Sequence, residues 1–183
     1  MELSGNLREI GFSQMIELIA HLEGTLELWK LPQKRSAQLY IKKRKLRCVR
    51  VNGQFLDGLR AKAFFVELAM SKQGLFEFNA RQFRTPCKKP LNWPLSRILL
   101  SISTQADEHI RNMEILPDPK LRFRLAKPAN EKDSLFLRAA GELLQRDKGA
   151  NAKEIANRLR LPVDQVRYYL HKLAERNKVS PAE

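Results

Sequence analysis

Apolar residues in the last third of the chain recur with the period of an α-helix. Between residues 134 and 144 they fall at the i, i+1, i+4, i+5 spacing that places them on one helix face. The same reasoning predicts a second helix over residues 151–159 and a third over residues 163–173. Helices this short are stable mainly through packing, so we expect the three to form a bundle.

Polar residues and glycine mark the expected ends of these helices. Asn151 and Glu154 have the spacing of a capping pair for the second helix. Leu161-Pro162 is expected to form the turn before the third helix. Gly149 is placed as the C-cap glycine of the first helix, and Asn177 as the left-handed stop of the third.

The first 115 residues alternate between helical and strand periods. Helices are expected over residues 12–22, 61–70 and 95–115. Short alternating segments predict strands over residues 24–29, 37–41, 46–51 and 74–78. The predicted fold class is therefore α+β: a small antiparallel sheet with helices, followed by a three-helix bundle.

A proline-rich, polar segment separates the N-terminal region of mixed periodicity from the helical C-terminal region. It contains Pro117 and Pro119, then Pro128 within a polar run, and proline ends helices. We therefore predict an α+β domain over residues 1–126, a linker over residues 127–133 and a helical domain over residues 134–183.

Positive charge dominates the composition and gathers in the first part of the chain. The net charge is +14, and 23 basic residues face 12 acidic ones up to Asn130. Nine basic residues and no acidic one lie between Glu27 and Asp57, and five more lie in a second acid-free stretch over residues 79–106. Such stretches point to a polyanion such as DNA, the alternative being a solvated basic loop.

Several short pieces of the N-terminal region together resemble the PATAN family of bacterial signalling domains. The resemblance implies a non-catalytic adaptor, usually found beside receiver or DNA-binding modules. This chain departs from the pattern where a glycine turn is usual, because it carries Lys42, Lys43, Arg44 and Lys45. The matching pieces are Leu3-Ser4-Gly5-Asn6-Leu7, Gly24-Thr25-Leu26-Glu27-Leu28, Asp57-Gly58-Leu59-Arg60-Ala61 and Gly74-Leu75-Phe76-Glu77-Phe78.

Residues 154–173 resemble a helix-turn-helix of the winged-helix type. Ala156 is small where the two helices would meet, and Leu161 would fill the turn. Arg160 stands where glycine is common. Only six residues follow Asn177, which is too few for a β-hairpin wing, so a winged-helix relative would lack its wing.

The resemblance and the charge pattern together select candidate DNA contacts. The outward face of the predicted recognition helix also carries Asp164 and Glu175, which make it nearly neutral, so a structural or protein-binding role is the alternative there. Phe83 and Trp93 could stack on unpaired bases or serve as core anchors. The candidates are Arg158, Arg160, Gln165, Arg167, Tyr168, His171 and Lys172 in the helical domain, and Lys42, Lys43, Arg44, Lys45 and Arg47 in the hairpin.

Signatures of catalysis are missing from the sequence. Gly53 and Gly58 have P-loop spacing, but Leu59-Arg60 replaces the required lysine and hydroxyl. The three histidines have no partners at metal-ligand spacing. We expect no enzyme activity and no cofactor. Cys48 and Cys87 are read as small buried residues in preference to a disulfide.

These observations favour a non-enzymatic protein that binds duplex DNA, as a transcriptional regulator or a nucleoid- or repair-associated factor. We expect a cytoplasmic homodimer without a membrane span. Residues 95–115 are a candidate dimer surface, the alternative being that this helix covers the N-terminal sheet. The alternative is a signalling adaptor that binds a protein partner through the PATAN-like domain.

Overall fold

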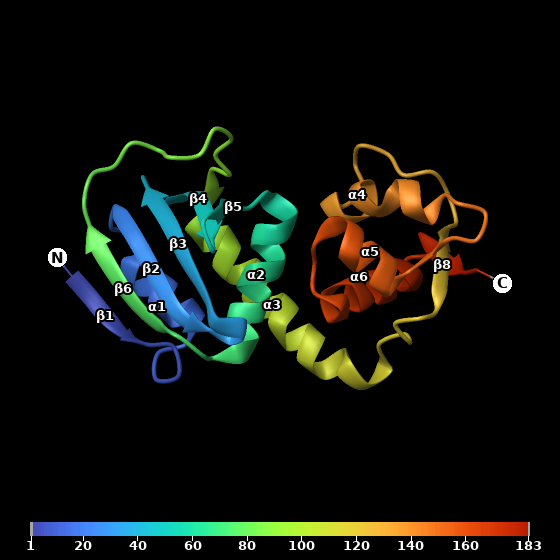
Figure 1. The fold of residues 1–183 in the computed structure, drawn as a ribbon, viewed down its shortest axis with the longest axis horizontal. Coiled ribbons are helices and arrows are strands. Elements are labelled where there is room, and N and C mark those ends of the chain that lie inside the picture. Colours follow the sequence, from blue (N-terminus) through green and yellow to red (C-terminus); the bar gives the residue numbers. More distant parts are fainter. Residues whose placement is uncertain (1, 183) are drawn as a thin grey trace. The chain divides into compact units, whose positions relative to one another are not determined.

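The computed structural model describes residues 2–182 and confirms the α+β class, with antiparallel sheets. The chain forms two compact units, one ending at Glu108 and the other starting at His109 (Figure 1). The boundary lies within helix α3 (Leu95–Asn112). Among the described residues, no helix is both long enough and apolar enough to cross a membrane.

The N-terminal unit is built on one antiparallel sheet with the strand order β1-β6-β2-β3-β4-β5 (Figure 1). A further strand, β7, pairs with the first residues of β4, whereas β5 pairs with the last ones. All four predicted strands are present, and β1, β5 and β7 are additional. The strands are β1 (Glu2–Asn6), β2 (Gly24–Leu31), β3 (Arg35–Lys42), β4 (Lys45–Val51), β5 (Gln54–Phe55), β6 (Leu75–Ala80) and β7 (Trp93–Pro94).

Three helices cover one face of this sheet. They are α1 (Phe12–Ile19), α2 (Gly58–Ser71) and the first part of α3. Alternate strand residues such as Leu39, Ile41 and Phe76 pack with Phe65 of α2 and Ile102 of α3 in a single core. Within the described residues of this unit, no helix covers the opposite face of the sheet, so the side chains there form a separate surface.

The C-terminal unit holds the three predicted helices and a three-stranded sheet. The helices are α4 (Leu135–Leu144), α5 (Ala152–Leu159) and α6 (Val163–Glu175). The sheet has the order β10-β8-β9, from β8 (Arg122–Leu125), β9 (Ala150–Asn151) and β10 (Val179–Pro181). After α6, the described residues Val179–Pro181 form the single strand β10, which pairs antiparallel with β8.

The domain boundary differs from the predicted one. Residues 109–126 belong to the C-terminal unit, since β8 is the central strand of its sheet. Arg122 strengthens this link by donating two hydrogen bonds to the Glu154 carboxylate, at 2.8 and 3.0 Å. A strand of four residues that pairs with segments 25 and more residues away leaves little local pattern in the sequence. The prediction therefore placed the boundary at the proline-rich segment and missed this strand.

Most predicted helix ends of the C-terminal unit are confirmed. The Asn151 side chain and the Glu154 side chain form the expected capping box of α5. Asn177 takes the left-handed conformation, with φ of 54°. The predicted role of Gly149 is wrong, because α4 ends at Leu144 with Gln145 as its C-cap. Glycine is required at position 149 because a Cβ there would lie 2.2 Å from the Phe123 carbonyl oxygen.

Candidate nucleic-acid interface

The four consecutive basic residues form the tip of the β3–β4 hairpin, as predicted. Lys42 pairs with Lys45, so the turn itself has two residues, Lys43 and Arg44. Both have positive φ, 52° and 56°, a conformation that costs side-chain-bearing residues about 1 kcal/mol each. The Lys43 backbone N–H donates to a Glu23 carboxylate oxygen at 3.0 Å. We call residues 42–45 the basic turn.

A second basic segment lies beside the basic turn. Residues 81–92, here the crossing segment, connect β6 to β7 and arch over the end of the sheet (Figure 1). The Leu91 N–H donates to the Arg47 carbonyl oxygen at 2.8 Å, and the Leu95 N–H to that of Arg44 at 3.1 Å. The fold thus joins the two acid-free stretches through residues that are 44 and 51 positions apart in sequence.

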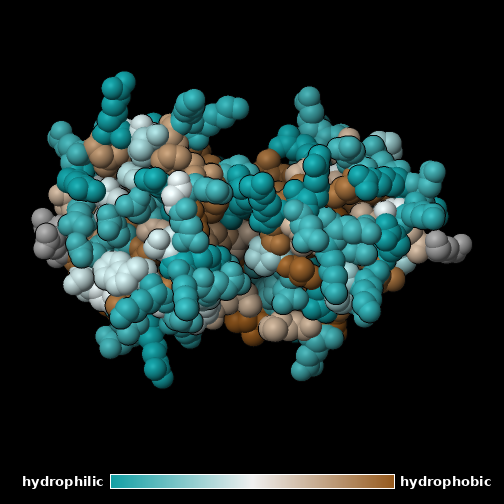
Figure 2. Space-filling model, viewed as in Figure 1, coloured by the Kyte–Doolittle hydropathy of each residue, from teal (hydrophilic) through white to brown (hydrophobic). Residues whose placement is uncertain are grey.

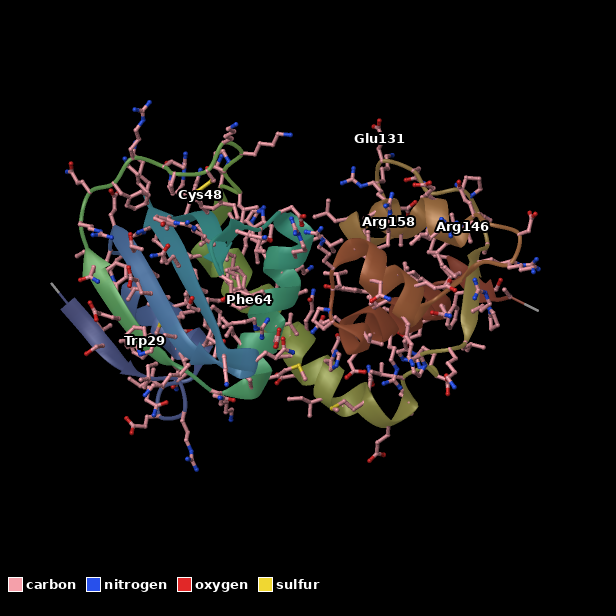
Figure 3. The ribbon with its side chains drawn as sticks, viewed as in Figure 1. Trp29, Cys48, Phe64, Glu131, Arg146 and Arg158 are labelled. Atoms are coloured by element: carbon pink, nitrogen blue, oxygen red, sulfur yellow. A yellow bond between two sulfur atoms is a disulfide. The ribbon has the colours of Figure 1, made fainter. Side chains whose placement is uncertain are left out.

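A disulfide between Cys48 and Cys87 also ties the crossing segment to β4 (Figure 3). The expectation of two unpaired buried cysteines is therefore wrong. The β4–β7 pairing brings residue 87 close to residue 48, with a Cα–Cα distance of 6.1 Å. Disulfides persist mainly in oxidising compartments, so this bond does not support the predicted cytoplasmic location.

The charge of this end of the molecule is little compensated from within. Of the fourteen basic residues in the two acid-free stretches, Arg35 is the one with an ion pair in the described part of the chain, to Glu67. Lys43, Arg44 and Lys45 are exposed, and so are Arg81, Arg84, Lys88 and Lys89 of the crossing segment. Arg47 is half-buried, and its Nε has no hydrogen-bond partner among the described residues.

The two aromatic candidates separate in the structure. Phe83, in the crossing segment, meets Tyr40 edge-on with a centroid distance of 5.6 Å on the sheet face without helices. Trp93 belongs to β7 and packs against the hydrophobic core, so it serves as an anchor. Only Phe83 therefore lies among the exposed basic residues.

The outward face of α6 is largely occupied by the chain's own residues. Gln165 and Tyr168 are 4% and 5% exposed. Tyr168 lies 5.3 Å from the ring of His109, centroid to centroid. Arg167 donates to the carbonyl oxygens of Leu116 and Pro117, at 3.1 and 2.7 Å, and pairs with Asp164 at 2.8 Å.

The remaining candidates of the C-terminal unit differ in exposure. His171 and Lys172 are half-buried, 3.5 and 2.9 Å from carboxylate oxygens of Glu175. Arg158 and Arg160 are exposed on α5 and its C-cap, and Arg158 is labelled in Figure 3. Arg160 has φ of 54° and ψ of 49°, the left-handed geometry expected where glycine is common.

Segment 109–117 explains why the face of α6 was misjudged. Helical periodicity identifies the residues that point away from the α4–α5 core, but not what else packs on them. Here His109, Leu116 and Pro117 contact that side. Of the seven candidates in this unit, Arg158 and Arg160 are the two that the structure leaves exposed.

Burial also perturbs two titratable groups of this unit. It lowers the pKa of His109, with a smaller lowering by the nearby Arg167 charge and an opposing effect of Asp164. Burial raises the pKa of Tyr169 to about 12. No group of three or more metal-ligating side chains exists within residues 2–182.

Comparisons with protein-family models, curated proteins and solved structures find no match to this chain. The resemblance to PATAN and winged-helix domains therefore stays a prediction. Function is inferred instead from the fold and the surface charge.

Proposed function

We propose that this protein is a non-enzymatic DNA-binding protein that holds the phosphate backbone on its N-terminal unit. The surface consists of the basic turn and the exposed cations of the crossing segment. The observation that carries the proposal is the cluster of exposed basic side chains at one end of the sheet, for which the described residues supply little compensating charge. A regulatory or a nucleoid- or repair-associated role remains the expected context.

Physical chemistry supports this surface over the face of α6. Each phosphate contact releases condensed counterions, and this release supplies most non-specific affinity. The basic turn and the crossing segment present exposed lysines and arginines, whereas Arg167 is committed to two backbone carbonyls and an aspartate. In the C-terminal unit, Arg158 and Arg160 are the candidates that we retain for backbone contacts.

The conformation of the basic turn permits a test that does not damage the fold. Asn-Gly is the preferred sequence for a two-residue turn with positive φ at both positions. The double substitution Lys43→Asn, Arg44→Gly removes two charges and relieves strain. We expect the slope of log affinity against log salt for a random DNA duplex to become shallower by about 1.8, which is two phosphate contacts at about 0.9 each.

A matched control exists at the opposite end of the sheet. Lys34 and Lys72 are exposed lysines with positive φ, 57° and 47°. Lys34 precedes β3, which ends at Lys42, and Lys72 is the C-cap of α2. The variant Lys34→Gly, Lys72→Gly should keep the slope of the unmodified protein. Equal slopes for both variants, or no duplex binding at micromolar protein, would refute the proposal.

A second candidate function is a protein-binding adaptor or a homodimer, which exposed apolar residues on α3 and η2 (Met113–Ile115) favour. In the C-terminal unit, Ile110, Met113 and Ile115 are each more than half exposed. Soluble proteins seldom present several large apolar side chains along one segment without a partner. Light scattering after size-exclusion chromatography would detect a dimer, and the substitution Ile115→Ser should weaken it.

A further inference from the structure

The face of the N-terminal sheet that carries no helix has a graded row of side chains across five strands. The strand registers align Glu77, Glu27, Gln38, Arg50 and Phe55 in that order from β6 to β5. One side of the row is acidic, and the other is cationic and aromatic. The cationic and aromatic side is formed by Arg50, near the end of β4, and Phe55 of β5; the basic turn precedes the other end of β4, and Cys48 of the disulfide lies between them.

Three aromatic rings gather on the cationic side of this face. Tyr40 lies 5.6 Å from Phe83 and 6.4 Å from Phe55, measured between ring centroids. None of the three belongs to the core beneath the helices, and Phe55 is 38% exposed on a two-residue edge strand. The Arg50 guanidinium lies 5.7 Å from the centre of the Phe55 ring, and the Lys42 ammonium 6.0 Å from that of Phe83.

A pocket of about 460 Å³ opens on the same face, next to the row. Glu27, Gln38 and Arg50 of the row line it, together with Trp29 and Asn52. Trp29 supplies an aromatic surface, and the amide and guanidinium groups supply donors and acceptors at its rim. Trp29 lies toward one end of the sheet and Cys48 toward the other (Figure 3). Figure 2 shows that hydrophilic side chains surround the few apolar ones on the visible side of this unit.

We infer that this face binds single-stranded DNA, with unpaired bases on Tyr40, Phe55 and Phe83. The inference rests on the proposed function and specifies the form of DNA that the site takes. Bases in a duplex are stacked inside it, out of reach of rings on a flat sheet, whereas unpaired bases stack on such rings at about 1–3 kcal/mol each. Lys42, Arg50 and the crossing segment provide the charge for the accompanying phosphates.

The experiment compares the full chain and its variants on two probes at one salt concentration. The probes are a labelled 20-nucleotide oligothymidylate and a random duplex of the same length. Phe55→Leu removes one aromatic face but keeps an apolar side chain, on an edge strand where unfolding is not expected. We expect oligothymidylate affinity to fall about fivefold or more and duplex affinity to change less than twofold. Adding Phe83→Leu should increase the loss.

The controls separate this inference from the proposed function. Leu18→Ala removes a 49% exposed apolar side chain from α1, on the helix-covered side, and should leave both affinities unchanged. Lys43→Asn, Arg44→Gly should weaken both probes. If Phe55→Leu keeps the thermal unfolding unchanged and lowers both affinities equally, or lowers neither, the single-strand inference is overturned and DNA binding stands. If neither the oligothymidylate nor the duplex binds, both the single-strand inference and the proposed function are overturned.

Discussion

The disulfide between Cys48 and Cys87 leads to a stability prediction that can be worked out from the fold. It joins positions separated by 39 residues, so the oxidised chain keeps a closed loop when it unfolds. The chain-entropy relation for a loop of about this length gives roughly 4 kcal/mol of stabilisation at 25 °C. We expect reduction, or the double substitution Cys48→Ala, Cys87→Ala, to lower the unfolding free energy of the N-terminal unit by about 2–4 kcal/mol.

Tryptophan fluorescence during urea unfolding is a suitable assay. The chain has two tryptophans, and both Trp29 and Trp93 belong to the N-terminal unit, so the signal reports that unit alone. With a urea dependence of about 1–3 kcal/mol per molar, a loss of about 2–4 kcal/mol should lower the unfolding midpoint by roughly 0.7–4 M. Free energies and not midpoints alone should be compared, since the cross-link also makes the unfolded state more compact.

Two results would refute this reasoning. One is the titration of two free thiols in the folded, unreduced protein under oxidising conditions, which would show that no bond forms. The other is an unfolding free energy that is the same with and without reductant, although mass spectrometry shows the bond broken. Either result would mean that pairing of β4 with β7, and not the cross-link, holds the crossing segment in place.

Two further predictions concern the C-terminal unit. Arg160→Gly should raise the unfolding free energy of this unit by about 0.5–1 kcal/mol, because φ is 54° at position 160, and it should weaken DNA binding. Arg158→Gly, inside helix α5, should instead lower the unfolding free energy by about 1 kcal/mol. Urea unfolding followed by circular dichroism would measure both changes. Burial lowers the pKa of His109, so as the pH falls below 6.5 this imidazole is protonated in the unfolded chain before it is protonated in the folded one. The unfolding free energy should therefore fall with the pH in that range. His109→Gln should lose that part of the pH dependence; an identical stability–pH curve would exclude His109 as its source.

Local interactions made much of this fold predictable. The capping box of Asn151 and Glu154 and the left-handed Asn177 depend on residues within a few positions, so the sequence pattern contains them. The strands that bury alternate residues, such as Leu39 and Ile41, were also recognisable. The positive φ of Arg160 followed from its place at a helix end, whatever its side chain.

The sequence alone determined the amphipathic elements, their class and the two acid-free stretches, because composition and short-range periodicity define them. Tertiary structure decided which of these meet. Pairing of β7 with β4 brought Cys87 to Cys48 and the two basic stretches together, and segment 109–117 covered the side of α6 that periodicity had left open. Such contacts join residues 39 to 51 positions apart, and their free energy depends on burial across the whole unit, which no local pattern records.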